Sequence, residues 1–325
     1  MASPVPLVRV FRSGVEEAVH LGSIAVADER GVLVASAGDS GRIAFARSSA
    51  KPLQAAVSLS LADEDPSDAE IAVMCGSHNG EDVHIETVQK LLGRAGLDFS
   101  ALRCPPALPL DLEAARVVPE PRPELHNCSG KHAGMLLACV RRGFDRDSYP
   151  EPDHPIQQSI LSAVGLAAGT PPVAVGIDGC GIPVHAFPLV GLATMYARLA
   201  RPERLESLAP AAARAIRGMV SEPYLVAGHA RICTLVMQAV SGVIVKVGAE
   251  GLLCAALPEK GLGIAIKVEE GSGRPWGPSL LRVLKFLDAL SSDEEASLEA
   301  MAHPPVLGGG RPVGEVRSDF ELVTS

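Results

Sequence analysis

A serine and a lysine lie three positions apart where a helix is expected to begin. The segment 47–51 contains the pattern S-x-x-K, and Pro52 follows at a position that the first turn of a helix tolerates. A separation of three residues places the Ser48 hydroxyl and the Lys51 amine on one helical face. A neutral lysine there could accept the serine proton and activate the hydroxyl for attack on a carbonyl carbon. A capping serine beside a solvated lysine is the structural alternative.

A second lysine lies on an expected strand in the last third of the chain. Lys246 stands two residues before Gly248 in the apolar segment 243–248. Serine-lysine acyl-transfer enzymes carry a late K-[ST]-G strand beside the nucleophile, and Val247 at the middle position makes this match partial. A buried lysine on an apolar strand is costly unless it is paired or functional. A lysine that points to water from an edge strand is the alternative.

Lysine is scarce in this chain, which has 22 arginines and only 7 lysines. Arginine serves wherever a solvated positive charge is enough, but it does not give up its proton near neutral pH. An amine that acts as a base or a metal ligand therefore has to stay lysine. A coding bias toward arginine explains the same ratio, and both explanations direct attention to the lysines that remain.

Ser77 follows the apolar segment 71–75, which we expect to be a short buried strand. A serine that comes directly after such a strand is well placed for catalysis. A cap for the amphipathic helix expected at 81–95 is the ordinary alternative.

The most concentrated set of reactive side chains lies in two glycine-bearing segments. Cys128, Lys131 and His132 lie in one, and Asp178 and Cys180 in the other. Two cysteines that meet in space could bind zinc as soft ligands, with the neighbouring lysine, histidine or aspartate completing the site. Two buried, inert thiols explain the spacing equally well. A Cys128 nucleophile with His132 as its base is a further alternative.

Strand patterns at both ends and helical patterns between them predict the fold class. Strands are expected within 5–36 and 243–269, and residues of about 50–240 are largely helical. The proline-rich segment 103–125 predicts a long loop or a lid, and the tail 303–325 predicts loose packing. We therefore expect an α+β fold in which both termini build one antiparallel sheet with helices packed on it.

Composition narrows the classes of function. The net charge of −9, without a cluster of basic residues, argues against nucleic acid as a partner. No apolar run approaches the roughly 18 residues of a membrane span, and the N-terminal segment lacks the apolar stretch of a secretory signal. Seven cysteines spread thinly along the chain indicate reduced thiols. We expect a cytoplasmic protein that acts on small polar metabolites and contacts no membrane.

Taken together, six segments resemble the asparaginase II family, the Rhizobium-type or class 3 L-asparaginases. The pair HNCSGKH and DGCG is the most specific part of the resemblance, and the segments span nearly the whole chain in the expected order. They are RSSAKPLQA at 47–55, SHNGE at 77–81, HNCSGKHAGML at 126–136, GIDGCGIPV at 176–184, KVGAEG at 246–251 and GIAIK at 263–267.

This resemblance implies a single catalytic domain over residues 1–325 with a serine β-lactamase-like fold, a homodimer and hydrolysis of L-asparagine. It implies two serine-lysine pairs, Ser48 with Lys51 and Ser77 with Lys246. Lys260, which also precedes a glycine, is the alternative second lysine.

The resemblance also implies a zinc site and substrate contacts. The zinc ligands map onto Cys128, Lys131 and Cys180, and a lysine ligand must be a neutral amine. The substrate-binding residues map onto Arg47, His132 and Asp178. Cys233 matches a further family position whose role stays open.

We expect Lys51 to take the Ser48 proton, Ser48 to attack the side-chain amide, and Ser77 with Lys246 to relay protons and stabilise charge. Water then hydrolyses the acyl-enzyme. A related serine amidohydrolase, either a glutaminase or a β-lactamase-like enzyme, is the enzymatic alternative. A non-catalytic module that binds an amino acid is the other.

Overall fold

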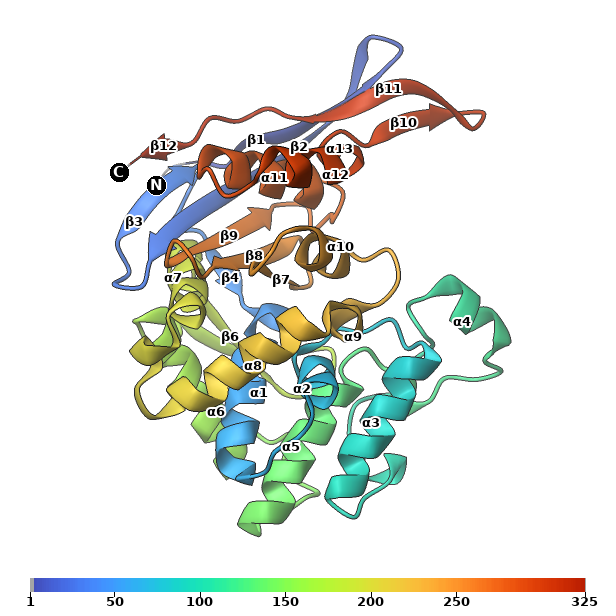
Figure 1. Ribbon diagram of the computed structural model, residues 1–325, viewed down its shortest axis with the longest axis vertical. Coiled ribbons are helices and arrows are strands. Elements are labelled where there is room, and N and C mark those ends of the chain that lie inside the picture. The colour runs from blue at the N-terminus through green and yellow to red at the C-terminus, as the bar shows by residue number, and fades with distance from the viewer. Residues whose placement is uncertain (1–2, 325) are drawn as a thin grey trace.

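The computed structural model describes residues 3–324. Its main feature is an antiparallel sheet in the order β10-β11-β1-β2-β9-β8-β7, in which β3 also pairs with β2 and β12 pairs with β3. Both ends of the chain contribute strands to this sheet, so the predicted α+β architecture is confirmed. Figure 1 shows the sheet at one end of the molecule and most of the helices at the other. The strands are β1 (Val5–Arg12), β2 (Val15–Asp28), β3 (Leu33–Ala37), β7 (Ile244–Val247), β8 (Leu252–Leu257), β9 (Leu262–Val268), β10 (Pro305–Gly308), β11 (Arg311–Ser318) and β12 (Val323–Thr324).

The helices form the second layer and the body of the molecule. α7 packs on β2, β8 and β9, and α11 packs on β1, β9 and β11. The helices are α1 (Lys51–Ala62), α2 (Asp68–Cys75), α3 (Asp82–Arg94), α4 (Leu112–Val117), α5 (Ser129–Arg142), α6 (Pro155–Ala168), α7 (Leu189–Ala200), α8 (Ala209–Ser221), α9 (Pro223–Ala227), α10 (Ile232–Ala239), α11 (Trp276–Phe286), α12 (Ser292–Ser297) and α13 (Glu299–Ala302), with 3-10 helices η1 (Arg47–Ala50), η2 (Phe99–Ala101), η3 (Pro123–Leu125) and η4 (Pro202–Leu208).

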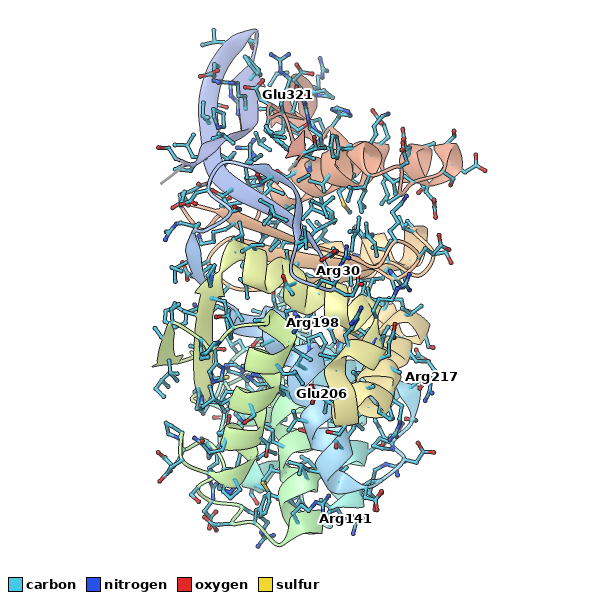
Figure 2. The ribbon with its side chains drawn as sticks, turned by 90° about the vertical axis from the view of Figure 1, so that its left-hand side faces the viewer. Arg30, Arg141, Arg198, Glu206, Arg217 and Glu321 are labelled. Carbon is cyan, nitrogen blue, oxygen red and sulfur yellow. The ribbon has the colours of Figure 1, made fainter. Side chains whose placement is uncertain are left out.

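Close packing joins the helices to the sheet. A Cβ atom at Gly263 on β9 would lie 2.0 Å from the carbonyl oxygen of Ala193 on α7, so only glycine fits there. Arg198 on α7 donates hydrogen bonds to the carbonyl oxygens of Leu166 on α6 and Glu29 after β2 (Figure 2). The core between the layers consists mainly of alanine, valine, leucine and isoleucine, as the low aromatic content requires.

A small second sheet, in the order β4-β6-β5, lies beside the helices. Its strands are β4 (Ile43–Phe45), β5 (Ala174–Ile177) and β6 (Pro183–Pro188). β4 ends two residues before Arg47, and β5 ends immediately before Asp178. This sheet therefore brings together two segments that lie far apart in the sequence.

Two secondary-structure predictions are wrong. Residues 71–75, expected as a strand, belong to helix α2, which begins with a capping box between Ser67 and Glu70. The tail, expected to pack loosely, forms β10 and β11, whose hairpin turns at Gly309 and Gly310 with positive φ angles. Alternation was too short to reveal these strands, and β11 is also held by pairing with β1, about 300 residues away in the sequence. The segment 103–125 is largely irregular and contains the short helix α4.

No helix among residues 3–324 combines the length and the apolar character that a bilayer span requires.

Candidate active site

Three distant segments meet around the hydroxyl of Ser77. The nitrogen of Lys51, at the first position of α1, lies 2.9 Å from Ser77 Oγ, and the nitrogen of Lys246, on β7, lies 2.9 Å from the same oxygen. Both lysines are fully buried and Ser77 is nearly so. Two amines that share one buried hydroxyl form an arrangement that structural packing alone does not require, because an ordinary buried lysine is costly.

Lys51 is surrounded by acceptors. Besides Ser77, its amine contacts the backbone oxygens of Gly76 and Asn127. An ammonium group has three N–H donors, so three acceptors match the charged form of this lysine. Burial lowers its pKa from the usual value, and the three acceptors compensate for part of the lost hydration.

The Lys246 amine has fewer hydrogen-bond partners than the Lys51 amine. It contacts Ser77 Oγ and the backbone oxygen of Val247, the latter at 3.0 Å. Burial lowers the pKa of Lys246 to about 7. A neutral amine keeps one lone pair and can accept a hydrogen bond from the Ser77 hydroxyl. The geometry therefore suits Lys246 as a proton acceptor and Lys51 as a fixed positive charge.

Ser48 lies on η1, directly before α1, and is half-buried. Among residues 3–324 no hydrogen bond joins its hydroxyl to Lys51, whose amine turns toward the segment after α2. The two residues are three positions apart, but the backbone passes from a 3-10 to an α-helix between them, which changes the relative direction of the side chains. The structure thus pairs both lysines with Ser77, and the predicted contact between Ser48 and Lys51 is not formed.

Arg47 and Asp178 bind each other at the edge of the small sheet. Arg47 Nε lies 2.7 Å from Asp178 Oδ1. Arg47 has a φ of 44°, a left-handed conformation that non-glycine residues rarely adopt. Such strained positions concentrate at functional sites. The structure therefore places these two predicted substrate-binding residues together, at the start of η1.

Cys128, Lys131 and Cys180 also converge. Lys131 Nζ lies 2.9 Å from Cys180 Sγ, and the neighbouring Cys180 thiol holds the pKa of Cys128 well below its usual value. Burial pulls the pKa of Lys131 downward, but the charges of Cys180 and Cys128 raise it above its usual value. Asp178 Oδ2 lies 3.7 Å from Cys180 Sγ.

The chemistry of these donors fits zinc. No group of three or more histidine, cysteine, aspartate and glutamate side chains in the described part of the chain has the arrangement of a metal site. The set formed here reaches three donors only when the Lys131 amine joins the two sulfur atoms. Two thiolates are nonetheless ligands that zinc accepts, and a lysine amine is an unusual third ligand. Lys131 would have to lose its proton to take part.

His132, one of the expected substrate-binding residues, is held in place by Tyr149. Its Nδ1 lies 2.6 Å from the hydroxyl of Tyr149, which also accepts a hydrogen bond from the backbone N–H of Arg103. Tyr149 therefore donates to His132, which leaves Nε2 as the protonated nitrogen. That buried nitrogen has no partner among the described residues. Burial also lowers the pKa of His132 well below its usual value, so the ring is neutral.

Asn79, a residue that no sequence pattern marked as functional, links three segments. Its side-chain amide donates to Glu81 Oε1 and to the backbone oxygen of His229. Its backbone oxygen accepts hydrogen bonds from the N–H groups of Leu110 and Asp111. This residue thereby fastens the segment 103–125 to the turn that carries Ser77. The motif SHNGE contained this signal, but its partners lie too far along the chain to be inferred from spacing.

Glu81 completes the same linkage. Its carboxylate accepts hydrogen bonds from the Tyr224 hydroxyl and the His229 backbone N–H. Burial raises the pKa of Glu81, but these hydrogen bonds outweigh it and lower the pKa below its usual value. A charged Glu81 therefore holds the segment after α9 against the turn at Ser77.

Comparison with solved structures gives distant similarities. A β-lactamase from Mycobacterium bovis is 17% identical, with 83% of this chain and 95% of that chain covered and a TM-score of 0.45. A probable glutaminase from Bacillus subtilis complexed with 6-diazo-5-oxo-L-norleucine is 15% identical, with coverages of 82% and 84% and a TM-score of 0.37. Mglu in its tris and glutamate form is 18% identical with a TM-score of 0.47, and the match spans 82% of this chain but only 59% of that longer chain. Similarities this distant transfer no activity.

No curated protein matches the sequence significantly. The sequence matches the family model described as L-asparaginase II over residues 8–318, which is nearly its full length. This match confirms the resemblance carried by the six sequence segments. The chain therefore belongs to the L-asparaginase II family of amidohydrolases.

Proposed function

We propose that this protein hydrolyses the side-chain amide of L-asparagine to give L-aspartate and ammonia, with Ser77 as the attacking hydroxyl. The observation that carries the proposal is the contact of the Ser77 hydroxyl with both Lys51 and Lys246. A hydroxyl beside a neutral amine is the arrangement that serine-lysine hydrolases require. Membership in the L-asparaginase II family supports the choice of substrate.

In the first step, neutral Lys246 takes the Ser77 proton while Ser77 Oγ bonds to the amide carbon of the substrate. The Lys246 ammonium then gives its proton to the departing nitrogen, which leaves as ammonia. In the second step, Lys246 takes a proton from water, and the resulting oxygen attacks the acyl ester. The proton returns to Ser77 Oγ as aspartate leaves. Lys51 keeps its charge throughout and stabilises negative charge on the serine oxygen.

Ser48, the nucleophile expected from the S-x-x-K pattern, has a different proposed place. Ser48 is more exposed than Ser77 and follows Arg47 in η1, directly before α1. We propose that it contacts the substrate, together with Arg47 and Asp178. We propose that His132 also contacts the substrate, as a hydrogen-bond donor through its free Nε2–H.

We also propose a zinc ion held by Cys128, Lys131 and Cys180. When bound, zinc would supply a Lewis acid that orients polar groups of the substrate. The residues that carry the proposal are the two neighbouring thiols and the amine 2.9 Å from Cys180 Sγ. No step of the hydrolysis above passes through the metal.

The resemblance to class 3 L-asparaginases supports three further proposals. These are a serine β-lactamase-like catalytic domain over residues 1–325, a homodimer and a cytoplasmic location. Light scattering on the purified protein tests the dimer, whose mass should be twice the 33.7 kDa of one chain.

Side-by-side assays test the substrate. Ammonia release from L-asparagine and from L-glutamine is measured together with hydrolysis of a chromogenic cephalosporin. We expect the highest kcat/KM with L-asparagine. A preference for glutamine or the cephalosporin would support the related serine amidohydrolases instead. Binding of L-asparagine without ammonia release would support a non-catalytic module.

A further inference from the structure

Arg231, which the mechanism above does not use, is linked by two independent routes to the segments that carry Ser77 and Lys246. Its Nη1 donates a hydrogen bond of 2.9 Å to Asn79 Oδ1. Asn79 is two residues after Ser77, and two residues of extended backbone span at most about 7 Å. The first route therefore leads directly from the guanidinium group to the turn that carries the nucleophile.

The second route passes through α10 and β7. Arg231 immediately precedes α10, and Cys233 in its first turn accepts a hydrogen bond of 3.4 Å from the backbone N–H of Val247. The carbonyl oxygen of Val247 in turn binds the amine of Lys246. Arg231 is thus fixed between the segments that carry Ser77 and Lys246.

The charge of Arg231 has no counter-ion in the described structure. Arg47, the other arginine at the site, is neutralised by Asp178. Arg231 forms no ion pair with a carboxylate among residues 3–324, although it is half-buried. The first turn of α10 carries no acidic residue, and the end of this helix adds positive potential. Burial is the main cause of the low pKa of Lys246, and the charge of Arg231 contributes to it.

We propose that Arg231 binds the α-carboxylate of the substrate. This inference rests on the proposed hydrolysis of an amino-acid amide. The bond to Asn79 occupies one of the five N–H donors of the guanidinium group, and the others suit a carboxylate in a two-point contact. An α-carboxylate anchored at Arg231 would orient the side-chain amide toward Ser77. Arg231 therefore restricts the enzyme to substrates with a free α-carboxylate.

The test compares two substrates that differ by one group. β-Alaninamide has the amine and the amide of asparagine but lacks the α-carboxylate. Arg231→Met should lower kcat/KM for L-asparagine about 10- to 100-fold, the usual loss for a hydrogen-bonded charge pair. It should lower kcat/KM for β-alaninamide only by the small effect of a higher Lys246 pKa, since Arg231 is a minor cause of that shift beside burial. Arg231→Lys should restore part of the preference, because it retains a positive charge.

Arg217→Met is the matched control, because it removes one arginine from the exposed surface of α8 (Figure 2). It should leave the preference for asparagine unchanged. An equal loss on both substrates in Arg231→Met would overturn the assignment, since that is what damage to the Asn79 contact alone would produce. Far-ultraviolet circular dichroism shows whether the variants fold.

Calorimetric binding separates this inference from the proposed function. The wild-type protein should bind L-aspartate more tightly than β-alanine, which lacks the α-carboxylate, and Arg231→Met should lose this difference. The measurement needs no turnover, so it remains decisive if the wild type releases no ammonia from either amide. Equal affinities of the wild type for the two acids would refute the role of Arg231.

Discussion

Lys246 and Ser77, 169 positions apart in the sequence, contact each other at 2.9 Å in a site where the lysine is fully buried. The strand β7 carries the amine, and the turn after α2 carries the hydroxyl. Because burial lowers the pKa of Lys246 to about 7, a large fraction of this lysine is a neutral base at physiological pH. The contact supplies the base that the hydroxyl needs in order to attack an amide.

Replacement of either serine distinguishes their roles. Ser77→Ala should lower kcat at least about 1,000-fold, because it removes the attacking oxygen. Ser48→Ala should lower kcat/KM only about tenfold, the loss of one substrate hydrogen bond. Steady-state ammonia release from L-asparagine measures both, and unchanged melting temperatures exclude misfolding. The reverse order of effects would return the nucleophile to Ser48, as the S-x-x-K pattern predicts.

The pH dependence of kcat/KM should report Lys246. Below about pH 7 this lysine is protonated and cannot accept the serine proton, so activity should rise with pH through an apparent pKa near 7 and then level off. Lys246→Arg should abolish activity across the whole range, since arginine keeps its proton. The range from about pH 5.5 to about pH 8.5 extends roughly one unit or more to either side of the expected pKa. A rate that stays constant over this range would exclude Lys246 as the base.

Lys246 should also limit stability. Its folded-state pKa lies below the usual value of 10.5, so protonation favours the unfolded chain. The resulting penalty is fully present below about pH 7 and disappears as pH rises toward 10.5. Lys246→Met should therefore raise the melting temperature at pH 6 by roughly 2–6 °C and lose activity.

The gain in melting temperature should shrink at pH 10. Differential scanning calorimetry at the two pH values checks it, with Lys90→Met on the exposed face of α3 as the control. A destabilised Lys246→Met protein at both pH values would show that this amine contributes more through its hydrogen bonds than it costs through burial.

Metal binding should depend on the two cysteines and the lysine that meet at Cys180. Elemental analysis of the purified protein should find about one zinc per chain, the stoichiometry of a single three-ligand protein site. Cys180→Ser and Lys131→Met should each reduce the zinc content strongly and raise KM. Cys139→Ser, which changes a buried thiol elsewhere on α5, should retain the metal. Zinc-free wild-type protein with full activity would remove the metal from this account.

The sequence was sufficient to predict most elements and the sheet built from both ends. Hydrophobic periodicity and turn residues determine these features locally, as in the helix 129–142, which ends at Gly143 with a positive φ. The helix at 68–75 was missed because its apolar run is short and nearly uniform, a pattern that a buried strand shares. The capping box at Ser67 and Glu70 was the signal that could have separated the two.

The sequence predicted which residues meet at the site but not which lysine contacts which serine. Two serine-lysine pairs were expected, and the structure instead directs Lys51 and Lys246 to one serine. Spacing along one helix suggested the partner of Lys51, whereas the real partner comes from packing of α1 against the turn after α2. The position of Arg231 beside Asn79 depends on contacts between segments about 150 residues apart, which no local pattern encodes.

Identification of the acylated residue tests the central claim most directly. The wild-type protein is treated with a diazoketone analogue of asparagine or quenched with acid during turnover, and the adduct is located by mass spectrometry of its peptides. We expect the adduct on Ser77 and none in the Lys246→Met variant. An adduct on Ser48, or one that forms at the wild-type rate without Lys246, would contradict the proposed role of the Ser77–Lys246 contact.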